Sequence, residues 1–216
     1  MEKLSSESVS KRKVQAAATR DRIFYCANEL FSQKEYEKIT VAEICRNAGV
    51  SVGAFYHHFE SKESILSEGY RQFDSEVEES WNEWHPGTPV EDIRFLISLQ
   101  AGAMESNGYF GSLQYFKNQL SANEKYILDK SRFFYRTIYE SVELAKAVGL
   151  MSGNTDEITD NLLALTRGTI YDWCLHSGSY GLKEKCDFVV SLVLSYYSQN
   201  AKIDGNRKSP LESTPT

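Results

Sequence analysis

Residues 40–59 of this 216-residue chain read TVAEICRNAGVSVGAFYHHF, a pattern that predicts two short helices and the turn between them. Thr40 can cap the first helix while Glu43 reaches back to the same end, the reciprocal pair of a capping box. Gly49 suits the end of that helix, and Ser51 suits the start of the second. Two short helices joined by a four-residue turn are typical of a helix-turn-helix that reads DNA.

The second of these helices has two faces of different character. At about 100° per residue, Phe55 and Phe59 fall on one side, which predicts that they point into a core. Gly53, Ala54 and His57 fall on the opposite side. Gly53 permits close approach of the backbone to DNA, and Ala54 offers a methyl group to thymine. The outward face is therefore predicted to be small and neutral.

Other side chains in this stretch suit contact with phosphates. Tyr56 lies between the two faces and can place its hydroxyl on a phosphate. Lys62 falls in the first turn of the next predicted helix, where its ammonium and the free backbone N–H groups favour an anion. The adjacent His57 and His58 lack the i, i+4 spacing of histidine metal ligands, so we expect no metal here. His58 is expected to brace the helix or to touch a phosphate.

Helical periodicity dominates the whole chain, and no segment alternates at period two, so we predict an all-α protein of about nine helices. Glycine, proline and capping residues mark the ends of the helical segments. The ranges expected to be helical are 17–33, 40–49, 51–59, 61–84, 90–106, 109–120, 122–148, 155–176 and 182–201.

Composition excludes several classes of protein. Hydrophobic residues at 41% and charged residues at 25% are ordinary for a soluble globular chain. The longest apolar run, 188–197, has about half the roughly 20 residues of a membrane helix, and no export signal is visible, so we expect no membrane and a cytoplasmic location. The four cysteines form no C-x-x-C pair and are expected to be structural, with no cofactor. No catalytic motif is present, so we expect no enzyme.

The net charge of −6 is unevenly distributed. Residues 1–22 carry six basic and three acidic side chains, and residues 1–70 carry ten of each. The whole acidic excess therefore follows residue 70, and the N-terminus is the part suited to lie beside a polyanion. The basic cluster of Lys11, Arg12 and Lys13 with Arg20 and Arg22 is either a solvated tail or an arm that reaches adjacent DNA.

Residues 40–66, TVAEICRNAGVSVGAFYHHFESKESIL, resemble the N-terminal signature of TetR-family transcriptional regulators. The resemblance covers roughly residues 18–68, with the specific core G-V-S-x-G-x-x-Y-x-H-F-x-S-K-E, and it departs at Cys45, where alanine is common. It implies a homodimer whose third helices enter successive major grooves of a palindromic double-stranded DNA operator, and a small-molecule effector that releases this repressor. The positions that it places at DNA are Thr40, Ser51, Val52, Gly53, Ala54, Tyr56, His57, His58 and Lys62.

The small number of cations near the helix-turn-helix also favours a dimer. Each subunit offers only about two to four cations to phosphates, so tight binding needs two subunits held one helical turn or a multiple apart. The last two long helices suit either a four-helix interface between subunits or an intrachain core. The same residues serve both alternatives: Leu162, Leu165, Thr169, Phe188, Val189, Leu192, Val193 and Tyr196.

Of the 27 aromatic residues, 19 follow residue 70, which favours an aromatic-lined effector cavity, although the same spacing suits a packed core. The candidates for lining it are Met104, Phe116, Phe134, Ile138, Thr166, Ile170 and Trp173.

The chain is thus expected to have four parts: a flexible basic arm over 1–16, a helix-turn-helix DNA-binding domain over 17–63, a helical ligand-binding and dimerisation domain over 64–201, and a disordered tail over 202–216. The alternative function is that of a co-regulator with the same fold that binds a protein partner instead of DNA. The balanced charge of the first 70 residues favours that alternative.

Overall fold

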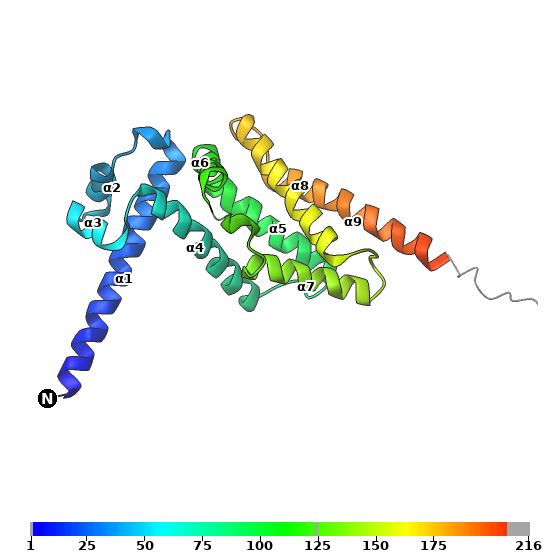
Figure 1. Cartoon of the computed structure of the whole chain (residues 1–216), viewed down its shortest axis with the longest axis horizontal. Coiled ribbons are helices and arrows are strands. Elements are labelled where there is room, and N and C mark those ends of the chain that lie inside the picture. The colour runs from blue at the N-terminus through cyan, green and yellow to red at the C-terminus, as the bar shows by residue number, and fades with distance from the viewer. Residues whose placement is uncertain (1, 124, 207–216) are drawn as a thin grey trace, which may run out of the picture. The chain divides into compact units, whose positions relative to one another are not determined.

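The computed structural model describes residues 2–123 and 125–206, and the side chains of residues 11–123 and 125–198. That part of the chain contains nine α-helices, two short 3-10 helices and no strand, which confirms the all-α prediction (Figure 1). None of the described helices is both long enough and apolar enough to cross a membrane. The elements are α1 (Glu2–Gln33), η1 (Tyr36–Lys38), α2 (Val41–Ala48), α3 (Val52–His58), α4 (Lys62–Glu83), α5 (Pro89–Ser106), α6 (Gly108–Ser121), η2 (Tyr126–Leu128), α7 (Phe133–Ala147), α8 (Thr155–Leu175) and α9 (Leu182–Asn206).

The two ends of the helical part differ from the predicted ones. α1 begins at Glu2, because its sequence contains neither glycine nor proline to interrupt a helix before Gln33. α9 continues to Asn206. The remainder of the predicted tail, from residue 207 onward, lies outside the described residues.

The predicted helix over 122–148 is wrong in its first part, since α7 begins only at Phe133. Side chains there bind nearby backbone groups and so compete with a helix. The backbone N–H and the hydroxyl of Ser131 both donate to Oδ1 of Asp129, at 2.8 and 2.7 Å. The N–H of Ile127 donates to Oε1 of Gln119 at 2.9 Å.

The contacts within the chain define two compact units, which are described separately. The first unit contains the chain up to Gln72 together with Met104–Ile127, and the second contains Phe73–Ala103 together with the chain from Leu128 onward. α6 therefore belongs with the N-terminal helices, whereas the sequence suggested a single boundary after residue 63. The functional division into DNA-binding and ligand-binding parts stays a prediction.

α6 belongs to the first unit because of specific contacts with α1 and α4. The Tyr115 hydroxyl on α6 donates to Oδ1 of Asn28 on α1 at 3.1 Å, and the Tyr70 hydroxyl on α4 donates to the Tyr115 carbonyl at 3.1 Å. A Cβ atom at position 69 would overlap the Tyr115 ring. The close approach of α4 and α6 therefore requires Gly69.

The core of the first unit is formed mainly by α1, the short elements that follow it, and the start of α4. Both α2 and α3 lie beside α1 (Figure 1). The buried cluster consists of Ile23, Phe24, Ala27, Leu30, Phe31, Tyr36, Ile39, Ile44, Cys45, Ala48, Phe55, Phe59, Ile65, Leu66, Tyr70 and Tyr115.

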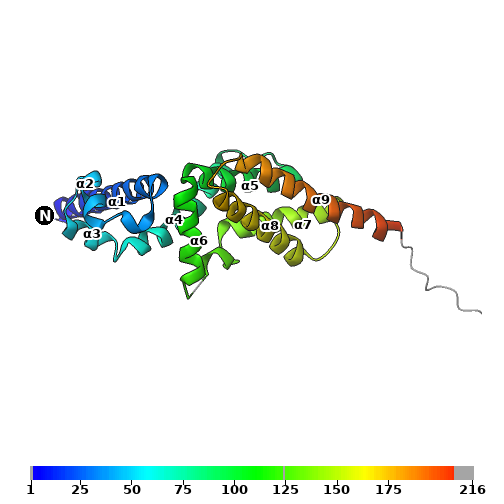
Figure 2. The ribbon, with the colours of Figure 1, turned by 90° about the horizontal axis from the view of Figure 1, so that it is seen from above.

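In the second unit α8 packs against both α7 and α9 (Figure 2). Ile138 and Leu162 are fully buried there.

A buried ion pair joins the second half of α4 to the start of α7. The Arg132 guanidinium donates to both carboxylate oxygens of Asp74, at 2.8 and 3.0 Å. Because both side chains are buried, removal of either partner is expected to destabilise the second unit.

The turn between α2 and α3 depends on the backbone conformation of Gly49. Its φ of 62° and ψ of 40° are left-handed, a conformation that L side chains disfavour. This conformation lets the N–H of Val50 donate to the Cys45 carbonyl at 3.0 Å, and the N–H of Gly49 to the Arg46 carbonyl at 3.3 Å. These two bonds satisfy carbonyl groups at the end of α2 as in a Schellman motif.

We predict that Gly49→Ala lowers the free energy of unfolding by about 1 kcal/mol, because the added Cβ is strained in the left-handed conformation. Gly49→Asn is the matched control and should cost less, since asparagine adopts this conformation more readily. Urea unfolding followed by circular dichroism measures both. Equal stability of wild type and Gly49→Ala would contradict the proposed role of the turn.

Candidate nucleic-acid interface

The two short helices carry the caps that the sequence predicts. The N–H of Glu43 donates to the hydroxyl oxygen of Thr40 at 3.2 Å, and the N–H of Ala54 donates to the hydroxyl oxygen of Ser51 at 3.1 Å. Each hydroxyl accepts these bonds and keeps its own proton for another acceptor. Thr40 and Ser51 are both exposed, so each lies at a helix start with a donor available to an anion.

The predicted faces of α3 are confirmed. Phe55 is fully buried and Phe59 is 3% exposed, and their ring centroids lie 6.0 Å apart. Gly53 is exposed on the other side, and a Cβ atom added to it would meet nothing closer than the Ser51 hydroxyl oxygen at 3.9 Å. Open space therefore lies directly outside the α3 backbone at position 53.

The other predicted contact residues of α3 surround this open position. The exposed fraction is 45% for Val52 and 56% for Tyr56. Ala54 and His58 are half-buried, and His57 is exposed. α3 thus brings Val52, Gly53, Ala54, Tyr56 and His57 to one accessible surface without any acidic residue among them.

The two adjacent histidines have different surroundings. Their ring centroids lie 5.0 Å apart at an interplanar angle of 74°. Partial burial lowers the pKa of His58, and repulsion from His57 and Arg20 lowers it further. The lowered pKa favours the neutral form of His58, and the neutral form leaves this end of α3 weakly charged.

Lys62 points inward more than the sequence suggests. Its ammonium donates to the carbonyl oxygens of Tyr36 at 2.9 Å and of Ile39 at 2.6 Å, and it lies 4.0 Å from the centroid of the Tyr36 ring. These contacts fasten the start of α4 to η1 and to the residue that follows it. Since an ammonium has three N–H donors, one is left for a phosphate.

Arg20, one residue of the predicted basic cluster, is also fixed within the first unit. Its guanidinium makes two bonds of 2.7 Å to the Glu68 carboxylate and lies 5.2 Å from the centroid of the Phe59 ring. The bond to Glu68 raises the pKa of Arg20. Burial opposes ionisation of Glu68, but Arg20 and Arg71 outweigh it and lower the pKa of that carboxyl. Lys11, Arg12, Lys13 and Arg22 stay exposed on α1.

Two residues near the turn, Cys45 and Arg46, have roles in the structure that were not predicted from the sequence. The buried Cys45 thiol donates to the Ser51 carbonyl at 3.8 Å and so links α2 to the start of α3; burial raises the pKa of this thiol. Arg46 is an exposed cation in the last turn of α2. Its place beside the turn follows from the helix-turn-helix spacing, whereas nothing in the sequence indicates the partner of Cys45.

The seven residues predicted to line an effector cavity come from both units. Five belong to the second unit, and all five are buried: Phe134, Ile138, Thr166, Ile170 and Trp173. The Thr166 hydroxyl donates to the Leu162 carbonyl at 2.9 Å, and the Trp173 ring N–H donates to the Tyr180 carbonyl at 2.9 Å. The other two, Met104 and Phe116, belong to the first unit and are half-buried.

The residues predicted for a subunit interface divide into two groups. Leu162, Thr169 and Val193 are buried inside the second unit, and Val189 is half-buried. The others are exposed by about half of their surface: Leu165 51%, Phe188 55%, Leu192 56% and Tyr196 61%.

Comparison with known proteins agrees with this geometry. Residues 23–68 match the family model described as bacterial regulatory proteins, tetR family. The HTH-type transcriptional regulator AcrR of Shigella flexneri is 26% identical over 199 residues, which are 87% of this chain and 93% of that protein. The HTH-type transcriptional regulator UidR of Escherichia coli K12 is 32% identical over 82 residues, which are 38% of this chain and 39% of UidR.

Solved structures share the fold. The transcriptional regulator FadR from Bacillus subtilis, in complex with stearoyl-CoA, aligns with a TM-score of 0.63 at 19% identity, over 81% of this chain and 97% of FadR. FadR of Thermus thermophilus, a TetR-family repressor in complex with lauroyl-CoA, aligns with a TM-score of 0.58 at 20% identity, over 91% of this chain and 100% of its own. The family-model match over residues 23–68 and the similarity to AcrR along most of the chain support a TetR-family transcriptional regulator.

We predict that Lys62→Met lowers the free energy of unfolding by about 1–3 kcal/mol, because two charge-assisted hydrogen bonds to carbonyl groups are lost. Lys38→Met is the matched control, since Lys38 makes only an exposed ion pair with Glu35 at 3.0 Å and should cost less than about 0.5 kcal/mol. Urea unfolding measures both variants. An effect of Lys62→Met as small as that of Lys38→Met would argue against the inward role of Lys62.

Proposed function

We propose that this protein is a TetR-like repressor that binds a palindromic DNA operator as a homodimer and leaves it when a small-molecule effector binds. It acts in the cytoplasm and without catalysis. The observation that carries the proposal is the exposed surface of α3. Gly53 and Tyr56 are accessible on this surface, while Phe55 and Phe59 anchor the opposite side of the helix in the core.

The first turn of α3 is the part proposed to read bases. Recognition helices contact base edges in the major groove with their N-terminal residues, which here are Val52, Gly53 and Ala54. Their small apolar side chains suit contact with thymine methyl groups, and Gly53 lets the backbone come close. Specificity would then depend on shape more than on charged side chains.

Phosphate contacts are proposed for the residues around this turn. Thr40 and Ser51 offer hydroxyl donors, and Tyr56 extends its hydroxyl from the exposed surface of α3. His57, His58 and the remaining N–H of Lys62 complete the predicted set, and the exposed Arg46 and the basic start of α1 add positive charge. Few of these groups are cations, so a single copy would bind weakly and two are required for tight binding.

A homodimer is supported by an exposed apolar stripe on α8 and α9. α9 exposes an apolar residue every four positions, at Phe188, Leu192 and Tyr196. α8 packs against α9 and exposes Leu165. Contiguous apolar surface on a soluble protein marks an interaction site, and paired helices commonly form a four-helix interface.

An effector is supported by the solved structures with the same fold. The FadR proteins of B. subtilis and T. thermophilus were crystallised with stearoyl-CoA and lauroyl-CoA, and the second is described as a repressor. An effector of this chain would release DNA only if it binds one conformation more tightly than the other. The five of the predicted cavity residues that belong to the second unit are the proposed lining: Phe134, Ile138, Thr166, Ile170 and Trp173.

The DNA-binding proposal predicts that Gly53→Ala and Tyr56→Phe both weaken DNA binding. The added methyl of Gly53→Ala would meet the DNA backbone or bases and should cost about tenfold in affinity, roughly 1.4 kcal/mol. The same substitution should not lower the free energy of unfolding, because position 53 has space for a Cβ and alanine favours a helix. Tyr56→Phe loses one hydrogen bond to a charged phosphate and should cost about tenfold or more in affinity.

The measurement is fluorescence anisotropy at low salt with DNA that the wild-type dimer selects from a random pool. Tyr25→Phe is the matched control, because Tyr25 is 55% exposed and Tyr56 is 56% exposed, yet only Tyr56 lies on α3. If the dimer selects no DNA but captures a protein partner, the chain is instead a co-regulator. The balanced charge of residues 1–70 is the observation in favour of that second function.

The dimer proposal predicts that Leu192→Glu converts the protein to monomers, because a carboxylate would be buried at the centre of the apolar stripe. Leu144→Glu is the matched control, since Leu144 is 57% exposed on α7 and Leu192 is 56% exposed on α9. Sedimentation velocity measures the oligomeric state of each variant. A wild-type monomer, or a Leu192→Glu dimer as stable as that of Leu144→Glu, would overturn the proposed interface.

A further inference from the structure

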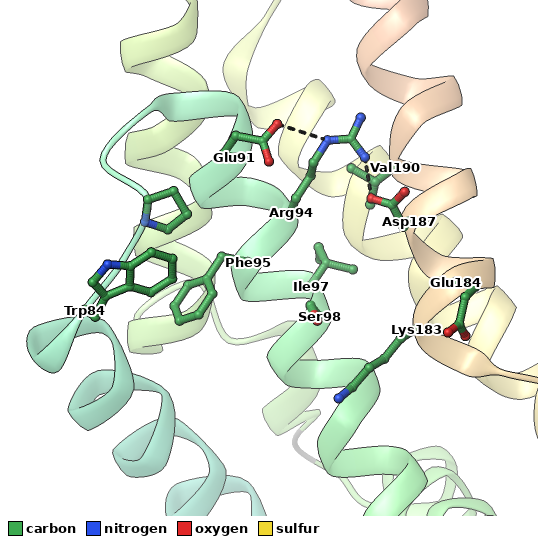
Figure 3. Close-up of a pocket in the computed structure, with 11 residues that line it drawn as sticks. Trp84, Glu91, Arg94, Phe95, Ile97, Ser98, Lys183, Glu184, Asp187 and Val190 are labelled. Atoms are coloured by element: carbon green, nitrogen blue, oxygen red, sulfur yellow. Dashed lines mark hydrogen bonds and ion pairs between the residues drawn. The ribbon is translucent and has the colours of Figure 1, made fainter.

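A groove of about 540 Å³ lies in the second unit between α5 and the first turns of α9 (Figure 3). Its volume is within the range of sites for small ligands. None of the seven residues predicted for an effector cavity lines it. Its lining consists of Trp84, Pro86, Glu91, Arg94, Phe95, Ile97, Ser98, Lys183, Glu184, Asp187 and Val190.

Two contacts fix α5 and α9 on either side of the groove. At one end the Arg94 guanidinium on α5 pairs with the Asp187 carboxylate on α9. At the other end Lys183 of α9 extends toward α5 (Figure 3) and lies over Gly102, where an added Cβ would come within 2.8 Å of its Cε and 3.1 Å of its Nζ. The two helices are therefore antiparallel here, and the absence of a side chain at position 102 makes room for the lysine.

The charges around the groove leave one cation uncompensated. Arg94 is neutralised by Asp187 and by Glu91, whose carboxylate lies 3.6 Å from its Nε. The Glu184 carboxylate folds back over Gly181. Among the described residues, Lys183 makes no hydrogen bond or ion pair to any side chain. Its ammonium therefore stands at one end of the groove without an anion.

The opposite wall of the groove is aromatic. Trp84 is 64% exposed, and its ring is perpendicular to that of Phe95, with the centroids 5.5 Å apart and an interplanar angle of 87°. Phe95 precedes Gly102 by seven residues, so the aromatic wall and the lysine are about 10 Å apart along one face of α5. Ile97 and Val190 lie at the floor of the groove and are buried, at 1% and 0% exposed, so the accessible apolar surface is that of Trp84 and Phe95.

We propose that this groove binds a small amphipathic carboxylate, with a flat apolar body against Trp84 and Phe95 and the carboxylate on the Lys183 ammonium. The bound anion would give Lys183 the charge-assisted hydrogen bond that the chain itself does not provide. The body would cover aromatic surface that is exposed to water in the free protein. This site goes beyond the proposed repressor function and requires no DNA.

The test is calorimetric titration of the whole protein with 2-naphthoate, a flat apolar body that carries one carboxylate. We expect binding at micromolar to millimolar concentration, and at least tenfold weaker binding of 2-naphthamide, which has the same shape without the charge. Lys183→Gln should weaken 2-naphthoate binding about tenfold, and Lys183→Arg should largely restore it. Phe95→Ala should weaken binding of both compounds.

Lys185→Gln is the matched control, because Lys185 is an exposed lysine of the same helix that does not line the groove. Gly102→Ala gives a second variant, since its methyl would displace Lys183 and should also weaken binding of 2-naphthoate. If Phe95→Ala or Gly102→Ala fails to fold, the test of the proposal rests on Lys183→Gln and Lys183→Arg, because Lys183 is exposed and its replacement leaves the core unchanged. No binding to wild type, equal binding of acid and amide, or equal binding by wild type and Lys183→Gln would overturn the proposal.

Discussion

The burial of Phe55 in the core of the first unit is the interaction on which the surface of α3 depends. α3 has seven residues, Val52–His58, and a helix of that length is not stable in water by itself. It is stable here because Phe55 is fully buried and Phe59, which follows it, is nearly so. This anchoring fixes the rotation of the helix, and the rotation determines that Gly53 and Tyr56 face outward.

The polar contacts around α3 hold this arrangement in place. Caps at Thr40 and Ser51 fix where the two helices begin, and Gly49 sets the turn between them. Lys62 and Arg20, which would be ordinary surface cations elsewhere, bind groups within the first unit. Positive charge is thus used to stabilise the scaffold, and the surface of α3 is left small and weakly charged. Such a surface suits close contact with DNA more than long-range attraction, which is consistent with a need for two copies.

Much of the fold was predictable from sequence because its signals are local. The 3.6-residue period predicts the buried and exposed sides of α3, and the capping residues predict where α2 and α3 begin. The loop before α7 was missed because its side chain to backbone bonds at Asp129 compete with a helix that the apolar pattern alone favours. The grouping of α6 with the first unit depends on the fit of Tyr115 against Gly69, which joins positions far apart in sequence.

Individual site residues were predicted less completely than the fold. The exposure of Gly53 follows from helix geometry, but the direction of the Lys62 ammonium depends on carbonyl groups of Tyr36 and Ile39, which a sequence does not place. The groove between α5 and α9 was also not predictable, because it requires Gly102 and Lys183 to meet across two helices. Sequence periodicity reports which face of a helix is buried, and it does not report which helix lies opposite.

The central claim is that two copies of α3, each anchored by Phe55, read DNA together. Methylation protection of a DNA duplex selected by the wild-type protein measures this most directly, because it maps contacts in the major groove. The account predicts two protected patches whose centres are one helical turn, about 10 base pairs, or a multiple of it apart. A single protected patch, or none in the major groove, would contradict it.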